Sequence, residues 1–562
     1  MQDQSSSESP HGTTRKHSRS QRILLWIAAA FFIVVVGVFI AASILLRRAE
    51  PVLRARVIET LSARFDSRVE LGYFHVYVLN GLEVTGGDLR LYPNDLDMQT
   101  PLFAVRKFSF KTGWRSFLHT PMHVGRVNLE GLALTMPPKE DRKNMPKMKN
   151  GESGGKIQIY VDQLLVKDAK LVLETNKPGK TPLEWDISNL ALTSIGAGQP
   201  LAFHAILTNP KPVGNIDSTG HFGPFNTESP GDTPIDGAYD FSHADLNSLK
   251  GIGGMLSSQG KYVGTLNNMV VDGETDTPDF QVDTGTHPIP LHTKFHAIVD
   301  GTNGDTYLQP VDAQLGHSHI VATGKVVLVR GQGHQITLDV VVGPARIEDM
   351  LRLGVKTMPP IMQGSLKLKT KLDIPPGKVS VTQKMRLKGN FQVLDATFSN
   401  DKVQAKVDEL SLRSQGKAGE AKKIDAQNPA LIQSDMQGVF ELGDSKLTFS
   451  ALNYKLPGAD INLTGVYSLD GNEFDFHGMA RLDAKVSQMM TGWKSILLKP
   501  VDPFFSKHGA GTEVPIKITG TRSEPKFGLD FKHKDDKDSP GGSPNKTKDS
   551  NSAGKSSATK TP

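Results

Sequence analysis

Few residues of this chain have types and spacings that could do covalent chemistry. Residues 151–155 read GESGG and match the G-x-S-x-G pattern of a serine nucleophile. They lie in a polar stretch with no predicted strand before it and no predicted helix after it, whereas a nucleophile elbow needs both. Gly260-Lys261 resembles the end of a phosphate-binding loop, but Tyr262 stands where that loop needs Ser or Thr. We therefore predict that the chain has no catalytic residue and is not an enzyme.

The sequence also lacks the patterns of a metal or cofactor site. His317 and His319 share one face of a predicted strand, but the chain has no cysteine and no acidic cluster lies near them in the sequence. No zinc-protease motif, dinucleotide fingerprint or pair of catalytic carboxylates occurs. Basic residues alternate along predicted strands, which is typical of a solvated face and not of a nucleic-acid-binding stripe. We predict no metal, no cofactor and no nucleic-acid partner.

The most informative stretch is residues 23–46, ILLWIAAAFFIVVVGVFIAASILL, which contains no charged residue and no histidine. A helix that rises about 1.5 Å per residue would cross a hydrocarbon core of about 30 Å at this length. A signal peptide usually has only about 7–15 apolar residues, so this stretch indicates an uncleaved transmembrane anchor. The basic residues that flank it tie in number, which leaves the orientation open. They are Arg15, Lys16, Arg19 and Arg22 before it, and Arg47, Arg48, Arg54 and Arg56 after it.

Composition and periodicity divide the rest of the chain. After the anchor, Leu53, Val57, Leu61 and Phe65 recur on one stripe of a helix. Charged and Pro-containing segments predict linkers, and segments without core-forming residues predict disorder. These patterns predict a disordered basic arm (1–22), the transmembrane helix (23–46), an amphipathic linker helix (47–68), a first β region (69–136), a polar linker (137–155), a second β region (156–531) with a helix near 483–499, and a disordered tail (532–562).

From residue 69 onward, apolar and polar residues alternate in short segments separated by Gly, Asn, Asp and Pro. Examples are LEVTGGDLRLY, GSLKLKTKLDI, KVQAKVDELSLR and ADINLTGVYSL. The connections are mostly too short for parallel crossovers, so most of the strands should be antiparallel neighbours in a long meander. Helical patterns are confined to 243–256, 344–355 and the segment near 483–499.

A short motif recurs inside the β regions: an apolar residue, two others, an apolar residue, one other and an apolar residue. It occurs at Leu79/Leu82/Val84, Val105/Phe108/Phe110, Val124/Val127/Leu129, Val161/Leu164/Val166, Ile187/Leu190/Leu192, Leu266/Met269/Val271 and Val407/Leu410/Leu412. A spacing of three and then two suits a bulge or tight turn that leads into a strand. Two copies align further, because Val124, Val127, Leu129 and Leu134 match Val161, Leu164, Val166 and Leu171. No strict period links all copies, which disfavours a propeller or regular solenoid.

An alternating sheet has one apolar face that something must cover. The few short helices cannot cover about twenty predicted strands, so the sheet should close on itself as a sandwich, a barrel or a rolled trough. A filled sandwich and an open trough both satisfy this pattern. An apolar trough that side chains do not fill would be a place for acyl chains.

Three segments resemble the AsmA family of envelope proteins. The opening RVIETLSARFDSRVELGYFHVYVLNGLEVTGGDLRLYP, followed by LFAVRKFSFKTGWRSFLHTPMHVGRVNLEGLALTMP, is similar to the start of that family. PVGNIDSTGHFGPFN, with Gly220 and Gly223, and the closing GTEVPIKITGTRSEPKFGLDF are similar to later parts of it. The resemblance spans roughly residues 24–531 and departs at Ser67, where the family often has Gly.

This resemblance implies a bacterial inner-membrane anchor with the β-rich bulk in the periplasm. It implies a mainly β fold, in which one transmembrane helix precedes a long antiparallel meander rolled into a taco-like groove with a few short capping helices. Phospholipid would be the ligand, outer-membrane biogenesis the role, and the inner membrane and envelope proteins the partners. The residues expected to line the groove are Val127, Leu129, Leu164, Val166, Leu190, Leu192, Leu410 and Leu412. The alternative is a non-enzymatic assembly or scaffolding factor with a packed β core.

Overall fold

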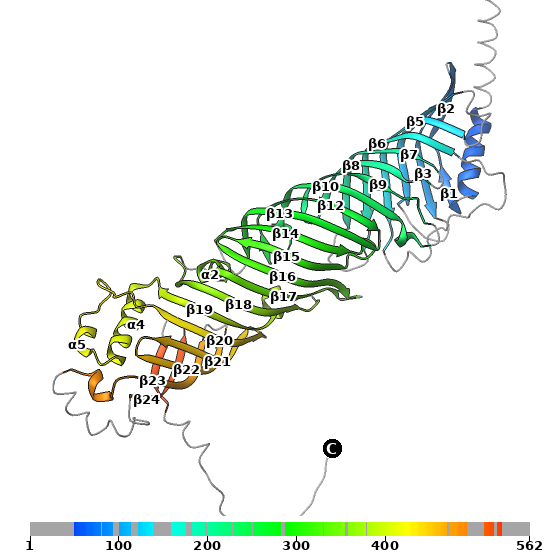
Figure 1. Ribbon diagram of the computed structural model, residues 1–562. Helices are drawn as coiled ribbons and strands as arrows, with labels where there is room; N and C mark the ends of the chain where they lie inside the picture. The colour runs from blue at the N-terminus through cyan, green and yellow to red at the C-terminus, as the bar shows by residue number, and fades with distance from the viewer. Residues whose placement is uncertain are drawn as a thin grey trace, which may run out of the picture. The chain divides into compact units, whose positions relative to one another are not determined.

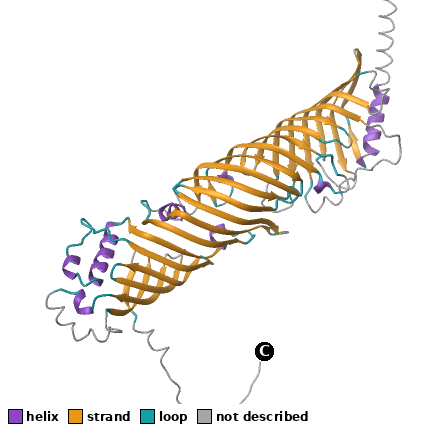
Figure 2. Ribbon diagram, in the orientation of Figure 1, coloured by secondary structure: helices purple, strands orange, loops and turns teal. Residues whose placement is uncertain are grey.

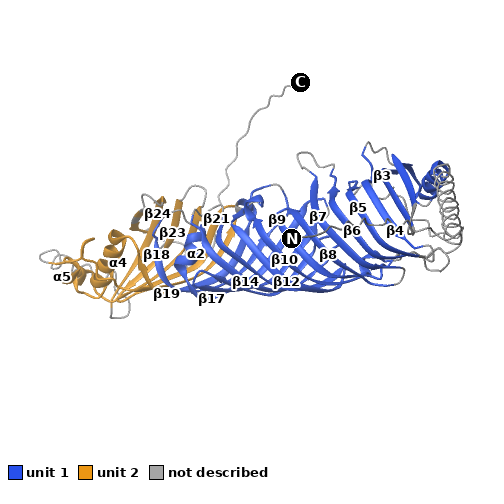
Figure 3. Ribbon diagram, turned by 90° about the horizontal axis from the view of Figure 1, so that it is seen from above, with its two compact units in different colours: residues 1–393 blue, residues 394–562 orange. Residues whose placement is uncertain are grey.

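The computed structural model shows a chain that is mainly β, with a mostly antiparallel sheet of 25 strands and few helices (Figure 2). It describes residues 50–530 except for 64, 80, 94–99, 114–121, 139–158, 176–181, 197–198, 227–228, 250, 283–286, 330, 355–357, 378, 469–472, 492–510 and 522–524. The chain divides into two compact units, which we call unit 1 (residues 1–393) and unit 2 (residues 394–562) (Figure 3). The boundary between them falls inside β19 (Arg386–Phe398). The predicted fold class, mainly β and mostly antiparallel, is confirmed.

In unit 1, nearly every strand pairs with the next strand of the chain, so consecutive strands lie side by side (Figure 1). The strands are β1 (Ser67–Glu70), β2 (Tyr73–Leu79), β3 (Gly81–Pro93), β4 (Phe103–Thr112), β5 (Met122–Met136), β6 (Ile159–Leu173), β7 (Leu183–Ile195), β8 (Leu201–Pro210), β9 (Val213–Phe222), β10 (Pro234–Asp245), β11 (Ile252–Gly253), β12 (Met255–Thr265), β13 (Asn268–Val282), β14 (Ile289–Val299), β15 (Thr306–Leu315), β16 (Ser318–Val329), β17 (Gly333–Arg346) and β18 (Met362–Ile374). The short helices are η3 (Pro230–Asp232), η4 (Leu246–Ser248), α2 (Ile347–Gly354) and α3 (Val381–Lys384).

A helix over residues 50–63 lies against the first edge of this sheet, inside the range predicted for the linker helix. Strands β1 and β2 both pair with β3 and together form that edge. Glu50 accepts a hydrogen bond from the backbone N–H of Val76 (3.2 Å), and Arg54 donates one to the carbonyl oxygen of Leu71. Edge strands carry unpaired backbone groups that can recruit another strand. The helix occupies one of them at Val76 of β2, and it also binds the carbonyl oxygen of Leu71 in the connection between β1 and β2.

Strands β5 and β6 pair in parallel and are an exception in a sheet whose strands, as predicted, are mostly antiparallel. A parallel pair needs a long return connection, and the chain between β5 and β6 contains the predicted polar linker, most of which lies outside the described residues. The pairing joins the two segments whose sequences match. Its register sets Val124 opposite Val161, Val127 opposite Leu164, Leu129 opposite Val166, and Leu134 opposite Leu171.

Irregular backbone accompanies the recurring motif of unit 1. The register shifts between Ile187 and Asn189, where β7 meets β8. In the pairing of β4 with β5, by contrast, the register continues unchanged across Arg106 and Gly131 (φ +67°), so the copy that begins at Val105 contains no bulge. The copy that begins at Leu266 instead lies on the tight turn between β12 and β13. The interpretation of the motif as a bulge or turn is confirmed at the copies that begin at Ile187 and Leu266.

Of the two helices predicted within the β regions of unit 1, only one forms. Helix α2 lies within the predicted segment 344–355. The segment 243–256 is not an α-helix: it contains the end of β10, the short η4 and the start of β12. Gly251 (φ +97°) and Gly254 (φ +122°) adopt conformations that an α-helix cannot contain, and Asp245 caps η4 by accepting a hydrogen bond from the backbone N–H of Asn247 (2.9 Å).

Unit 2 is a smaller antiparallel ladder with a packed core. Its elements are α4 (Asp401–Ser414), α5 (Ala418–Ala421), β20 (Ser434–Gly443), β21 (Lys446–Leu456), β22 (Ala459–Ser468), β23 (Glu473–Leu482), η5 (Val486–Met489), β24 (Thr512–Thr521) and β25 (Pro525–Leu529). Each strand from β20 to β24 pairs antiparallel with the next. The buried cluster at the centre of this ladder consists of Leu456, Ala459, Ile461, Leu463, Phe476 and Ala480.

The strand predicted from KVQAKVDELSLR is wrong, because these residues form helix α4. Asn400 caps the helix by accepting hydrogen bonds from the backbone N–H groups of Lys402 and Val403. The buried face of α4 is largely polar and includes Gln404 and Asp408. The alternating apolar residues that predicted a strand are therefore not the residues that the helix buries. Asp408 accepts hydrogen bonds from the backbone N–H groups of residues 430–432, which lie far along the chain.

The helix predicted near 483–499 is also wrong in its described part, where the chain forms only the short η5 before turning extended at Met490. The rest of that segment, residues 492–510, lies outside the described residues. So do the predicted basic arm, the transmembrane span 23–46 and the tail 532–562. Among the described residues, no helix is both long and apolar enough to span a bilayer.

Candidate functional site: the apolar face of unit 1

Strand register assigns one face of the unit 1 sheet to apolar side chains. Successive residues of a strand point to opposite faces, and residues directly opposite each other on paired strands share a face. Following the pairs from β5 to β18 gives two neighbouring rows on one face. Row 1 consists of Val127, Leu164, Leu192, Phe203, Gly220, Gly237, Tyr262, Val271, Ala297, Leu308, Gly324, Leu338 and Leu372. Row 2 consists of Leu129, Val166, Leu190, Ala205, Ser218, Tyr239, Gly260, Gly273, Phe295, Val311, Ala322, Val340 and Thr370.

The rows bring most of the predicted lining residues together. Val127, Leu164 and Leu192 are consecutive members of row 1 on β5, β6 and β7. Leu129, Val166 and Leu190 are the neighbouring members of row 2 on the same strands. These six side chains therefore form one apolar patch. We call all members of rows 1 and 2 together the apolar face.

The other two predicted lining residues do not join this patch. Leu410 and Leu412 lie on helix α4 of unit 2, and Leu410 is 36% exposed. The motif copy Val407/Leu410/Leu412 predicted that Leu410 and Leu412 share one face of a strand. In a helix, residues two apart point to different sides. Their assignment to a sheet face is wrong.

Neither row of the apolar face contains a charged residue, whereas the opposite face of the same strands does. On that polar face Lys261 pairs with Asp272, and Asp272 with His296 (2.7 Å between Oδ1 and Nδ1). The polar face of β18 carries the alternating series Lys367, Lys369 and Lys371. Water therefore solvates one face, and the other offers only apolar, hydroxyl and backbone groups.

The side chains of the apolar face are half-buried in most positions. Every residue of β8, including Phe203 and Ala205, has intermediate exposure. Among the members of both rows, only Val166 and Ala297 are buried. In a filled sandwich, the inward side chains of both sheets interdigitate and become inaccessible to water. The exposure of the rows therefore matches an apolar surface that a ligand could still cover.

Hydroxyl side chains interrupt the apolar face at β9–β12. Ser218 Oγ lies 2.8 Å from the hydroxyl oxygen of Tyr262, and Tyr239 forms a similar contact with Ser258 Oγ (3.1 Å). We call these four residues the hydroxyl cluster. Burial raises the pKa of Tyr239 and of Tyr262 above the ordinary value, so both phenols stay protonated at neutral pH.

Sequence reasoning did not find the hydroxyl cluster, although a signal was present. Its members alternate with glycine at a spacing of two, as in Gly237-x-Tyr239 and Ser258-x-Gly260-x-Tyr262. This spacing sets each tyrosine beside a glycine of the neighbouring strand, because Tyr239 pairs with Gly260 and Gly237 with Tyr262. A search for apolar residues alone passes over such positions.

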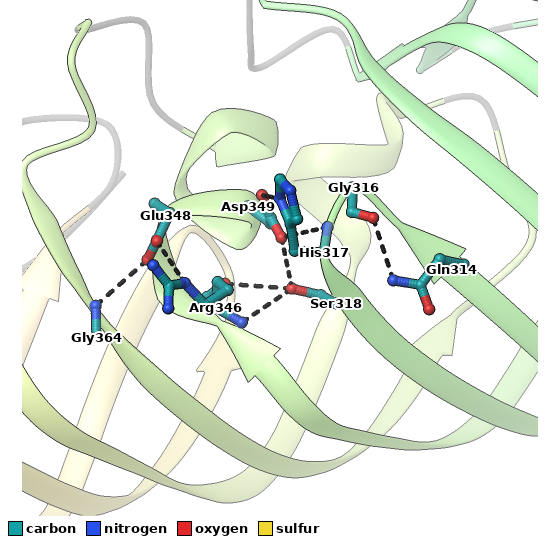
Figure 4. Close-up of polar contacts among 8 residues, drawn as sticks. All are labelled: Gln314, Gly316, His317, Ser318, Arg346, Glu348, Asp349 and Gly364. Atoms are coloured by element: carbon teal, nitrogen blue, oxygen red, sulfur yellow. Dashed lines mark hydrogen bonds and ion pairs between the residues drawn. The ribbon is translucent and has the colours of Figure 1, made fainter.

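A serine, a histidine and an aspartate meet where α2 contacts the turn between β15 and β16 (Figure 4). Asp349 is 2% exposed, and its Oδ2 accepts hydrogen bonds from Ser318 Oγ (2.8 Å) and from the backbone N–H of His317 (2.9 Å). Ser318 Oγ also accepts a hydrogen bond from the backbone N–H of Arg346 (3.0 Å). Nearby, Glu348 accepts one from Arg346 Nε (2.8 Å).

This arrangement does not have the geometry of a catalytic triad. In a triad the histidine stands between the serine and the aspartate, but here Ser318 donates directly to Asp349. The imidazole of His317 is 87% exposed, and its Nδ1 lies 4.0 Å from Asp349, beyond hydrogen-bond distance. Ser318 is fully buried, so no substrate could reach its hydroxyl. The network holds the turn to the helix.

The other motifs singled out from the sequence do not assemble a site either. His319 pairs with Asp312 (3.5 Å) and does not converge with His317, and the described residues contain no cluster of metal-ligating side chains. Gly260-Lys261 lies inside strand β12, not in a loop before a helix. The segment 151–155 lies outside the described residues.

A pocket of about 720 Å³ lies over β10–β15. Row 2 contributes Tyr239, Gly260, Gly273 and Phe295 to its lining, and the polar face contributes charged residues such as Lys261, Glu274 and Lys294. The charged residues belong to cross-strand ladders of opposite charge, which is typical of a solvated sheet face.

Comparisons of the chain with protein-family models, with curated proteins and with solved structures found no match.

Proposed function

We propose that the apolar face of unit 1 binds the acyl chains of phospholipids, and that the protein carries or conducts lipid between envelope membranes. The observation that carries the proposal is the pair of uncharged, half-exposed rows that continue from β5 to β18. A long, uncharged and largely apolar surface of this kind marks a binding site, since water would otherwise remain in contact with it. Covering it with hydrocarbon gains roughly 25 cal/mol for each Å² removed from water.

Acyl chains suit this face better than a folded protein partner does. Protein interfaces surround their apolar centre with a rim of polar and charged groups, and no charged group occurs along either row. Hydrocarbon chains need no hydrogen-bonding partners, so a long face without charges is complementary to them over its whole length.

The predicted anchor supports the same proposal. A transmembrane helix over residues 23–46 would keep unit 1 beside the membrane from which lipid is taken. In this proposal the membrane is the bacterial inner membrane and the β-rich units lie in the periplasm, where lipid travels toward the outer membrane. The resemblance of the opening and closing segments to AsmA proteins is consistent with this assignment.

The test uses the full chain in detergent, incubated with phospholipid, and counts bound lipid by native mass spectrometry and lipid extraction. Leu192→Glu sets a charge in the middle of row 1 and should reduce bound lipid several-fold. Thr193→Glu is the matched control, because Thr193 is adjacent in β7 and belongs to the opposite face. Its lipid content should equal that of the unmodified chain.

Circular dichroism of both variants checks that the sheet is intact. If Leu192→Glu binds as much lipid as Thr193→Glu while both are folded, the apolar face is not the lipid site. If the unmodified chain binds no lipid at all, the carrier function is wrong.

One observation favours a second candidate, a non-enzymatic assembly or scaffolding factor. In unit 2, Leu463 and Phe476 are buried within a packed cluster, so this ladder resembles an ordinary protein core. A packed unit would act through its surface and envelope protein partners. Crosslinking of the full chain in cells, followed by identification of linked proteins, would separate the candidates: stable protein partners and no lipid favour the scaffold.

A further inference from the structure

We propose that the hydroxyl cluster of Ser218, Tyr239, Ser258 and Tyr262 is a binding site for a lipid head group that carries N–H or O–H donors, an ammonium group above all. This inference rests on the proposed function, because it concerns the polar end of the molecule whose acyl chains the apolar face would bind. It adds a head-group preference, which nothing in the rows of apolar side chains would supply.

The proposal follows first from where each hydroxyl proton goes. Ser218 Oγ donates to the carbonyl oxygen of Ala238 (2.9 Å), and Ser258 Oγ donates to that of Glu274 (3.0 Å). A serine hydroxyl has one proton, so neither serine can donate to its tyrosine neighbour. Tyr262 must therefore donate to Ser218, and Tyr239 to Ser258.

With their protons engaged, the two tyrosine oxygens have only lone pairs left for a ligand. A phenol oxygen can accept a hydrogen bond while it donates one. The cluster therefore presents acceptors and no free tyrosine or serine donor. Burial raises the pKa of both phenols, so both tyrosines stay protonated at neutral pH and keep donating to their serine partners.

The tyrosine rings themselves cover the strands beside them. A Cβ built on Gly237 would lie 2.7 Å from Cζ of Tyr262, and one on Gly260 would lie 2.8 Å from Cε1 of Tyr239. Each ring thus occupies the space above a glycine of the paired strand. Both tyrosines are half-exposed, so the cluster offers aromatic surface beside its acceptor oxygens.

These two properties select the head group. An aromatic ring face attracts a cation, and an acceptor oxygen adds a hydrogen bond only if the cation has N–H groups. Ethanolamine head groups have both features, whereas choline head groups have the charge without the N–H donors. Glycerol head groups have O–H donors without the cation. The expected order is ethanolamine first, and choline and glycerol below it.

The experiment offers the full chain in detergent an equimolar mixture of phosphatidylethanolamine, phosphatidylcholine and phosphatidylglycerol with identical acyl chains. Bound lipid is extracted and quantified by mass spectrometry. We expect about threefold to tenfold enrichment of ethanolamine over choline lipid, the range that one or two hydrogen bonds supply. The double variant Tyr239→Phe and Tyr262→Phe keeps the rings and removes the oxygens, and should reduce this ratio to near one.

Tyr307→Phe is the matched control, because Tyr307 is a half-exposed tyrosine of β15 outside both rows. Its ratio should equal that of the unmodified chain. Enrichment of phosphatidylglycerol alone, with the same sensitivity to the double variant, would assign the donor to a hydroxyl and overturn the ammonium preference. Equal binding of all three lipids, or enrichment that survives the double variant, overturns the inference while leaving the carrier function intact. Absence of any bound lipid would instead overturn the proposed function.

Discussion

At the scale of single residues, buried carboxylates hold distant backbone together in both units. Asp349 in unit 1 accepts hydrogen bonds from the turn that follows β15, and Asp408 in unit 2 accepts them from residues 430–432. Each acid satisfies backbone N–H groups that no strand partner reaches. An unpaired N–H in such a position costs about as much as a lost hydrogen bond, which explains why polar residues occupy these buried sites.

Replacement of Asp349 tests its structural role as a hydrogen-bond acceptor for the turn between β15 and β16. Both of its bonds to the turn end on the same oxygen, Oδ2. Asp349→Asn can present its carbonyl oxygen there and should lower the free energy of unfolding by about 1 kcal/mol, whereas Asp349→Ala should cost about 2–4 kcal/mol. Urea unfolding of the full chain measures the difference. Equal losses for the two variants would contradict the role assigned to Oδ2.

A histidine gives unit 2 a pH-dependent contact. The hydrogen bond that His477 donates to Asp530 (2.5 Å), and secondarily the one that it donates to Asp475, raises the pKa of His477 above its ordinary value. A group whose pKa rises on folding stabilises the fold fully below its unfolded pKa, and this stabilisation is lost as the pH rises through the folded pKa. Asp530→Asn should therefore destabilise β23–β25 more at pH 6 than at pH 9.

Hydrogen–deuterium exchange of the β23–β25 amides, corrected for intrinsic exchange, measures this effect. Asp475→Asn is the control, because its carboxylate is 70% exposed and should matter less. A loss of protection by Asp530→Asn that is the same at both pH values would show that His477 is not charged in the folded unit.

At the scale of elements, glycine allows neighbouring strands to carry large rings on the apolar face. Glycine usually weakens a strand, since it has no side chain to pack. Here Gly260 and Gly273 are directly paired, and the ring of Tyr239 lies over the first of them. The absence of a side chain at these positions is what leaves room for the hydroxyl cluster.

Gly260→Ala should therefore destabilise unit 1, although alanine is tolerated in most strands. Its Cβ would lie 2.5 Å from the carbonyl oxygen of Asp272 and 2.8 Å from Tyr239 Cε1. The backbone of β13 cannot move away from this Cβ without breaking its hydrogen bonds to β12. We therefore expect the free energy of unfolding to fall by about 1–3 kcal/mol in thermal or urea unfolding. Gly443→Ala, in β20, meets nothing within 4 Å and should be close to neutral. A neutral Gly260→Ala would mean that the strands separate easily here.

At the scale of the whole molecule, both units have strands in which apolar and polar residues alternate, but the apolar residues are half-exposed in unit 1 and buried in unit 2. In unit 1, row members such as Leu164 and Leu192 keep part of their surface in contact with water. In unit 2, Ile461 and Leu463 are buried in a cluster. Alternation makes an apolar face in both cases, and only the layer above that face decides whether it becomes a core or a binding surface. The proposed lipid site therefore belongs to unit 1.

Much of the fold was predictable from local sequence. The alternation predicts strands, the short connections predict antiparallel neighbours, and the motif around Ile187 predicts a bulge where the register shifts. That six of the predicted residues on β5, β6 and β7 share one face was predictable as well, because a period of two fixes which residues of a strand share a face. These features depend on residues near one another in the chain.

Contacts between distant residues decided the rest. Residues 402–413 alternate like a strand, yet they form a helix because Gln404 and Asp408 satisfy backbone far along the chain. The parallel register of β5 and β6 depends on how a long connection returns, which local pattern does not encode. By itself, the sequence determined which side chains of one strand share a face. Only the tertiary structure decided which part of that face stays half-exposed, because burial depends on what packs against a sheet and not on the sheet's own alternation.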